Sequence, residues 1–271
     1  MGWAPSIESR SMSAPRGNGH YVPGPRPWRA MRAIGLGCFL PGFILALTGR
    51  RSWWGAIGVV VLALLAFVWW CDLVEEATIG GHHTYVMTNT LKFGFILFIL
   101  SEIMLFFSFF WSWLHSSLAP TVSLGGSWPP TGLIPVDPYR LPLFNTILLL
   151  SRGASVTWAH YQIVNGGYAM EPIWVTVYLG LFFIIRQAVE YKLCGFAMSD
   201  SVFGSIFYMT TGLHGAHVFV GAVFLTVGTV RMRLGHFSRL HHIGLEMAIW
   251  YWHFVDVVWL GLYVLYYVWI V

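Results

Sequence analysis

Seven long apolar stretches constrain the fold of this chain more than any other feature. Four of them contain no Asp, Glu, Lys or Arg, and the other three contain one or two. Each is long enough to cross a hydrocarbon layer of about 30 Å. The sequence therefore predicts an all-α, polytopic membrane protein with seven transmembrane helices. Each helix contains one of the apolar stretches, which lie at residues 33–49, 52–71, 93–114, 141–165, 172–191, 201–230 and 257–271, and the seventh helix also carries His253 and Asp256.

The composition supports this prediction and the distribution of charge gives an orientation. Hydrophobic residues make up 57% of the chain and charged residues only 10%, too few to cover a soluble globule. The arginines lie at helix ends and in the N-terminal tail, which is typical of membrane topology and not of nucleic-acid binding. With seven spans, the side of the N-terminus holds Arg10, Arg16, Arg26, Arg29, Arg32, Arg231, Arg233 and Arg239, and the other side holds Arg50, Arg51, Arg140 and Lys192. We therefore expect the N-terminus to face the cytoplasm or matrix.

The sequence divides the chain into three segments. Residues 1–32 form a polar extension rich in Arg, Ser, Pro and Gly, which suits a transit or disordered segment; Gly2 and Ser6 also fit a loose myristoylation pattern. Residues 33–77 form a helical hairpin with a very short turn. Residues 78–271 form a five-helix bundle, in which residues 118–140 are a Pro- and Gly-rich cap loop. The helix predicted from Tyr85 to Ser117 would be about 50 Å long, more than a perpendicular span needs.

One acidic residue, Glu102, lies in the middle of a predicted transmembrane helix. The cost of an unpaired charge in hydrocarbon makes such a residue a functional hypothesis. No basic residue lies within one turn of it in the sequence, so we expect a neutral carboxyl at pH 7. Two interpretations remain open: a proton-linked role, or a carboxyl that is hydrogen-bonded to a neighbouring helix.

Two further pairs of polar residues fall within predicted spans. Arg186 and Glu190 are four residues apart, on one helix face, and the sequence predicts a structural ion pair there. His253 and Asp256 are three residues apart, and we interpret them as a polar cluster that joins helices. Neither pair is predicted to be catalytic.

The residues that could bind metals are poorly placed for it. Cys38, Cys71 and Cys194 are widely spaced and form no Cys-x-x-Cys motif. His214 and His217 could share a helix face, but no zinc or copper signature accompanies them. The spacing predicts no metal ligand in this chain.

Several segments together resemble the subunit III family of mitochondrial and bacterial cytochrome c oxidases, from about Trp28 to the C-terminus. They include Gly81-His82-His83-Thr84, Ser101-Glu102, His115-Ser116-Ser117-Leu118-Ala119-Pro120-Thr121, Trp128-Pro129-Pro130-Thr131-Gly132, Thr157-Trp158-Ala159-His160 and Trp250-Tyr251-Trp252-His253-Phe254-Val255-Asp256. The resemblance implies a V of two helices and five helices with structural phospholipids in its cleft. It also implies a subunit without a cofactor of its own, which packs on subunit I, the holder of haem a and copper, alongside subunit II and accessory subunits. In the family this subunit supports assembly, durability, oxygen access and proton uptake.

The resemblance also implies a lipid site on the N-terminal side. Its expected residues are Glu76, His83, Arg231, Arg233 and His236. The family commonly has Arg where this chain has Cys71 and Glu75, so anionic-lipid binding is expected either to be weaker or to shift toward Arg233. The implied location is the mitochondrial inner membrane with the N-terminus toward the matrix, and a bacterial plasma membrane is the alternative.

Two other functions compete with this one. A quinol oxidase subunit III usually has five helices and lacks the first hairpin, so counting helices discriminates it. A proton-coupled transporter that uses Glu102 would show internal repeats, and the sequence has none. The leading prediction is a non-catalytic subunit of an oxidoreductase complex.

Overall fold

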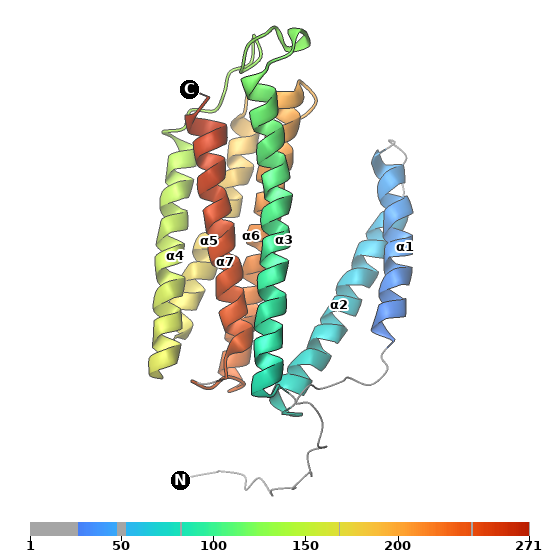
Figure 1. Ribbon diagram of the computed structural model, residues 1–271, viewed down its shortest axis with the longest axis vertical. Helices are drawn as coiled ribbons and strands as arrows, with labels where there is room; N and C mark the ends of the chain where they lie inside the picture. The colour runs from blue at the N-terminus through green and yellow to red at the C-terminus, as the bar shows by residue number, and fades with distance from the viewer. Residues whose placement is uncertain (1–26, 48–52, 82, 168, 240, 271) are drawn as a thin grey trace, which may run out of the picture. The chain divides into compact units, whose positions relative to one another are not determined.

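The computed structural model describes residues 27–47, 53–81, 83–167, 169–239 and 241–270, and within these it is all-α. Seven α-helices follow one another along the chain (Figure 1). They are α1 (Trp28–Leu47), α2 (Trp54–Thr78), α3 (Tyr85–Leu118), α4 (Leu141–Asn165), α5 (Met170–Leu193), α6 (Val202–Arg233) and α7 (Ile243–Leu262). A 3-10 turn, η1 (Val122–Leu124), lies between α3 and α4, and a π-helical segment, η2 (Tyr263–Val268), continues α7.

Five of the described helices are long and apolar enough to cross a membrane: α2, α3, α5, α6 and α7 with η2. The prediction of seven helices is confirmed. α1 contributes a shorter apolar segment, Ala30–Gly42, and α4 is less apolar than the other helices. The polar residues of α4 explain its lower hydropathy, because they face other helices: Asn145, Thr146 and Arg152 are all buried. α4 is 25 residues long and packs along both α5 and α7, so it crosses the same depth as they do.

The first helix begins earlier than the sequence predicts. The apolar pattern sets its start at residue 33, whereas α1 starts at Trp28. Arg32 lies within its first turns and its guanidinium carbon is 4.2 Å from the centre of the Trp69 ring of α2. The helix therefore accommodates charges that end an apolar run. Residues 1–26, with the polar extension and the myristoylation pattern, lie outside the described residues.

The chain divides into two compact units between Leu91 and Lys92, within α3. In the first unit, α1 and α2 form an antiparallel hairpin. Their backbones approach closely at Gly42 and Gly58, where an added Cβ atom would collide with Gly55 and Phe39 of the facing helix. The V-shaped arrangement of this hairpin and the five-helix bundle stays a prediction.

In the second unit, α4, α5, α6 and α7 pack around a common core (Figure 1). Each helix contacts the next, and α4 also contacts α7, which closes the ring. Trp252 of α7 is fully buried in this core. A Cβ atom added to Gly180 or Gly221 would lie 2.6 or 2.8 Å from its ring, so these glycines make room for the indole.

α3 joins this ring through aromatic side chains near its C-terminal end. The Trp113 Nε1 atom donates a hydrogen bond to the Leu265 carbonyl over 3.0 Å. The rings of Trp113 and Tyr266 stack with their centroids 3.9 Å apart. Trp128, from the loop that follows α3, packs edge-on against Trp113 at 5.0 Å. The cap loop is thereby fixed on the ends of α3 and η2.

Candidate functional site: polar groups inside the helix bundle

Arg152 and Asp256 form a buried ion pair between α4 and α7. The Arg152 side chain, near the middle of α4, is fully buried, and the Asp256 side chain is 10% exposed. Arg152 Nε donates a hydrogen bond to Asp256 Oδ1 over 3.0 Å, and Arg152 Nη2 lies 3.0 Å from the same oxygen. The guanidinium carbon also lies 4.9 Å from the Phe183 ring and 4.8 Å from the Trp252 ring. Charge and aromatic faces together offset the cost of burying this cation.

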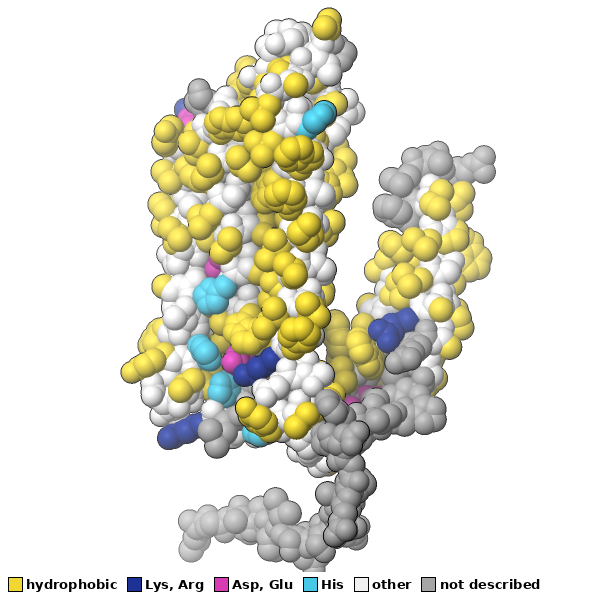
Figure 2. Space-filling view, viewed as in Figure 1, with side chains coloured by type: hydrophobic (Ala, Val, Ile, Leu, Met, Phe, Trp, Pro, Cys, Tyr) yellow, Lys and Arg dark blue, Asp and Glu magenta, His cyan; other side chains and the backbone are white. Residues whose placement is uncertain are grey.

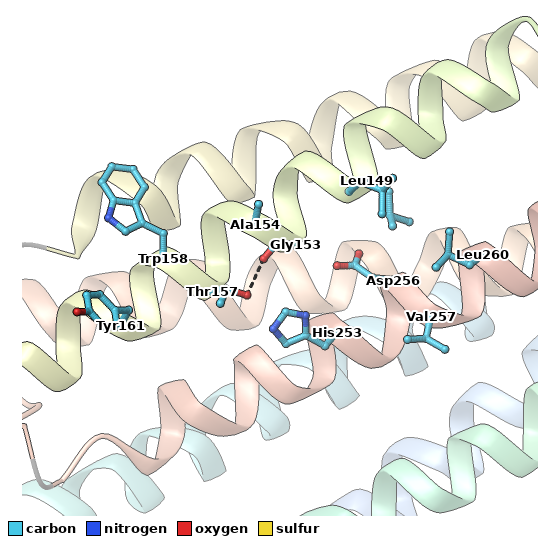
Figure 3. A pocket seen from close by; sticks show the side chains of 11 residues that line it. Leu149, Gly153, Ala154, Thr157, Trp158, Tyr161, His253, Asp256, Val257 and Leu260 are labelled. Atoms are coloured by element: carbon cyan, nitrogen blue, oxygen red, sulfur yellow. Dashed lines mark hydrogen bonds between the residues drawn. The ribbon is translucent and has the colours of Figure 1, made fainter.

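The sequence analysis places Asp256 and His253 in one polar cluster that joins helices, and in the structure Asp256 bonds a residue of α4. Asp256 turns to Arg152, 104 positions earlier in the chain. His253 is half-buried, and in the described part of the chain its ring nitrogens form no hydrogen bond. Both side chains line a groove between α4 and α7 (Figure 3). The polar cluster on α7 is therefore an ion pair with a free histidine beside it.

The expected ion pair between Arg186 and Glu190 is wrong. Glu190 Oε1 accepts hydrogen bonds from Tyr267 OH over 2.6 Å and from Gln187 Nε2 over 3.1 Å. The guanidinium carbon of Arg186 instead lies 5.0 Å from the Phe144 ring of α4. Neutral donors from η2 and from the preceding turn of α5 bond Oε1 of the carboxyl, and an aromatic face of α4 accommodates the guanidinium. Spacing along one helix cannot reveal such competing partners.

Glu102 has a partner on α6. Its Oε2 atom lies 2.9 Å from His217 Nε2, with the Glu102 and His217 side chains 19% and 13% exposed. The rings of Phe106 and Tyr251 lie 5.0 and 6.2 Å from the imidazole. A hydrogen bond to a neighbouring helix is one of the two interpretations left open by the sequence.

The second nitrogen of His217 determines how a proton is held in this pair. His217 Nδ1 lies 2.8 Å from the carbonyl oxygen of Leu213, and a carbonyl only accepts, so Nδ1 carries hydrogen. The bond between Nε2 and the Glu102 carboxyl then needs one more proton, on either atom. The pair is therefore a neutral acid with a neutral imidazole, or a carboxylate with an imidazolium.

The expected lipid-site residues lie in both units. Glu76 belongs to α2 and His83 to the segment that precedes α3, both in the first unit. Arg231 and Arg233 end α6, and His236 follows them in the second unit. The Arg231 guanidinium carbon lies 4.6 Å from the Phe237 ring, and Arg233 is exposed. The lipid site itself stays a prediction.

Among the described residues, no three or more His, Cys, Asp or Glu side chains gather as metal ligands would. His214 and His217, which share a helix, have separate partners. His214 Nε2 lies 3.2 Å from the Val255 carbonyl, whereas His217 bonds Glu102.

Comparison with known proteins identifies the family. The family model for cytochrome c oxidase subunit III matches residues 19–271. A cytochrome c oxidase subunit 3 from Pisaster ochraceus is 49% identical over 245 residues, which is 90% of this chain and 94% of that protein. The subunit 3 proteins of Phoca vitulina and Arabidopsis thaliana are each 44% identical, over 92% of this chain and 97% and 96% of their own lengths.

The chain belongs to the cytochrome c oxidase subunit III family. It is thus a multi-pass membrane protein and a subunit of a respiratory-chain oxidase. The resemblance seen in the sequence is confirmed. Within this family member, the residue that sequence reasoning missed is Arg152. A signal was present, because Arg152 is the single charged residue in the apolar run 141–165, and a lone cation there requires a partner from another helix.

Proposed function

We propose that this subunit III is a non-redox core subunit that supports the catalytic subunit while the oxidase reduces oxygen to water with electrons from cytochrome c. Its contributions would be assembly, durability in turnover, access for lipid and oxygen, and proton uptake. The observation that carries the proposal is the contact of 2.9 Å between His217 Nε2 and Glu102 Oε2. This pair can hold one proton at mid-membrane depth without a net charge.

Several features support a proton-linked role for this pair. Both side chains keep a small exposed fraction, so they are not sealed in the core. Moving a proton between Nε2 and the carboxylate needs no rotation of either side chain, because the two atoms are already at hydrogen-bond distance. The imidazole is fixed by Leu213 on its other nitrogen.

The proposal includes partners, ligands and a location. The chain would pack directly on subunit I, which holds haem a and copper, and lie in one complex with subunit II and accessory subunits. Structural phospholipids would bind near Glu76, His83, Arg231, Arg233 and His236. The clustering of arginine on one side supports an N-terminus toward the matrix of the mitochondrial inner membrane.

Replacing Glu102 by Gln in the complete oxidase tests the proposal. Gln keeps the shape and can donate to His217 Nε2, but it cannot titrate. Haem content and the initial rate of oxygen consumption should be unchanged, and the proton stoichiometry or the durability in turnover should fall. Glu246→Gln, which removes a carboxylate paired with Lys92 at 2.8 Å in the same bundle, is the matched control. Loss of electron transfer in a fully assembled, haem-replete Glu102→Gln oxidase would overturn the assignment of a non-catalytic subunit.

A further inference from the structure

The groove between α4 and α7 is the most distinctive feature of the surface that the function proposed above does not use. It is open to the outside, has a volume of about 720 Å³, and is lined by residues of both helices (Figure 3). Its α7 wall contains His253, Asp256 and Val257, and its α4 wall contains Gly153, Ala154 and Thr157. His253 and Asp256 lie near the middle of their helix and point toward α4 (Figure 3).

We propose that this groove receives a transmembrane helix of a neighbouring oxidase subunit, and that this helix presents a hydroxyl group to His253 and Asp256. The inference rests on the proposed function, because it needs a partner within the membrane. The inference specifies where on this chain the partner docks and which chemical group the partner presents.

The polar groups of the groove favour a protein over a lipid chain. Arg152 uses only one oxygen of Asp256, Oδ1, and the other oxygen, Oδ2, lies beside Gly153 at the groove wall. The ring nitrogens of His253 form no hydrogen bond within the described residues. At mid-membrane depth neither water nor a lipid headgroup is available, and an acyl chain cannot form hydrogen bonds.

Several other polar side chains on the outside of the bundle are satisfied from within the chain. Ser108 and Ser112 donate to carbonyl oxygens of their own helix, and Glu102 and His217 bond each other. Thr157, inside the groove, donates to the Gly153 carbonyl over 2.9 Å. Figure 2 shows histidine and acidic atoms among the apolar atoms on the face of α4 and α7. On the α7 wall of the groove, by contrast, His253 and Asp256 keep unused hydrogen-bonding capacity within the described residues.

The shape of the α4 wall fits a helix. Gly153 and Thr157 are four residues apart with Ala154 beside them, and small residues at this spacing let two helix backbones approach closely. A neutral imidazole offers one donor and one acceptor, and a carboxylate only accepts. A hydroxyl group both donates and accepts, so Ser, Thr or Tyr on the incoming helix complements both side chains.

Photo-crosslinking in the complete oxidase tests the proposal directly. A photoreactive amino acid is placed at Val257 or Ala154, both exposed in the groove. Ile185 on α5, which is 59% exposed and outside the groove, is the matched control. We expect adducts between the groove positions and another oxidase subunit, and lipid adducts at Ile185.

A second measurement addresses the hydrogen bonds. His253→Phe keeps an aromatic ring and removes both nitrogens, so the fraction of subunit III that stays with the haem-containing subunits after a detergent wash should fall by about threefold to tenfold. Ile185→Phe, outside the groove, should leave the fraction of subunit III that stays with the haem-containing subunits unchanged.

The outcomes separate the docking proposal from the proposed function. If the wild-type chain purifies with haem-containing subunits but both groove positions give only lipid adducts, the docking proposal is wrong and the function stands. Adducts with a second copy of this chain would replace the proposal with self-association. A wild-type chain that purifies without haem-containing subunits would overturn the proposed function, and the docking proposal with it.

Discussion

Two buried carboxyl groups in the same bundle are satisfied in opposite ways. Asp256, near the middle of α7, contacts the guanidinium of Arg152 at 3.0 Å. Glu190, near the end of α5, accepts hydrogen bonds from Tyr267 and Gln187, and no Lys, Arg or His of the described residues forms an ion pair with it. A buried carboxyl group in a membrane bundle therefore needs hydrogen-bond donors, and a cation is only one source of them.

The difference has a consequence for the charge of each site. Removing the partner of a buried ion leaves an uncompensated charge, whereas removing a neutral donor costs one hydrogen bond. We expect Asp256 to be ionised beside its cation and Glu190 to be neutral. Substitutions at the two sites should thus differ in magnitude.

The largest effect is expected for Asp256→Asn. The substitution leaves Arg152 charged and fully buried without its counter-ion, which should lower the free energy of unfolding by about 3–5 kcal/mol. Asp137→Asn is the control, because Asp137 pairs with Arg140 on the exposed cap loop at 3.0 Å, and such pairs contribute about 0–1 kcal/mol. Thermal unfolding of the purified oxidase, monitored as the release of subunit III, measures the effect of both substitutions. Equal effects of the two substitutions would show that Arg152 does not depend on Asp256.

Tyr267→Phe should have a smaller effect. It removes the short hydrogen bond of 2.6 Å to Glu190 and leaves a buried acceptor with Gln187 as its remaining donor. The expected loss of stability is about 1–3 kcal/mol. Tyr263→Phe, four residues earlier, removes a long bond of 3.4 Å to the Pro138 carbonyl and should cost less. The same release assay compares the two, and a larger loss for Tyr263→Phe would contradict the ranking.

The number of helices and most of their positions could be predicted from the sequence. Apolar runs gave the number of helices and the start of α3 at Tyr85, because the cost of burying backbone in hydrocarbon forces continuous helices. The apolar runs did not predict the start of α1, because charged residues continue this helix beyond the apolar segment.

The sequence could not predict which residues contact each other across helices. Arg152 and Asp256 are 104 positions apart and Glu102 and His217 are 115 apart, and nothing local in the sequence connects them. The ion pair predicted from local spacing, Arg186 with Glu190, was wrong, because Tyr267 from a distant segment bonds the Glu190 carboxyl. A lone charge in an apolar run predicts that a partner exists and does not identify it.

The hydrogen bond between Glu102 and His217 should stabilise the protein less than the buried ion pair of Arg152 and Asp256, and its coupling free energy should be modest. A double-mutant cycle with Glu102→Leu and His217→Leu should give an interaction free energy of about 0.6–1.7 kcal/mol, the range for hydrogen bonds between membrane helices. Each single substitution leaves a polar group without its partner, so the double variant should be more stable than the sum of the singles predicts. Additive losses would mean that the two side chains do not stabilise one another.

The smallest expected effect is the coupling between Arg186 and Glu190. The Arg186 guanidinium lies near the Phe144 and Phe182 rings, whereas the Glu190 carboxyl bonds Tyr267 and Gln187. Because the two share no hydrogen bond, a cycle of Arg186→Leu and Glu190→Gln should give an interaction free energy within about 0.5 kcal/mol of zero. Glu190→Gln should itself be mild, since Gln offers an oxygen to the same two donors and a neutral carboxyl carries no charge to lose. Subunit release on heating is again the readout, with the cycle of Arg152→Leu and Asp256→Leu as the coupled reference. A coupling above about 1 kcal/mol between Arg186 and Glu190 would restore the ion pair that their spacing predicts, and Glu190 would then resemble Asp256 instead of contrasting with it.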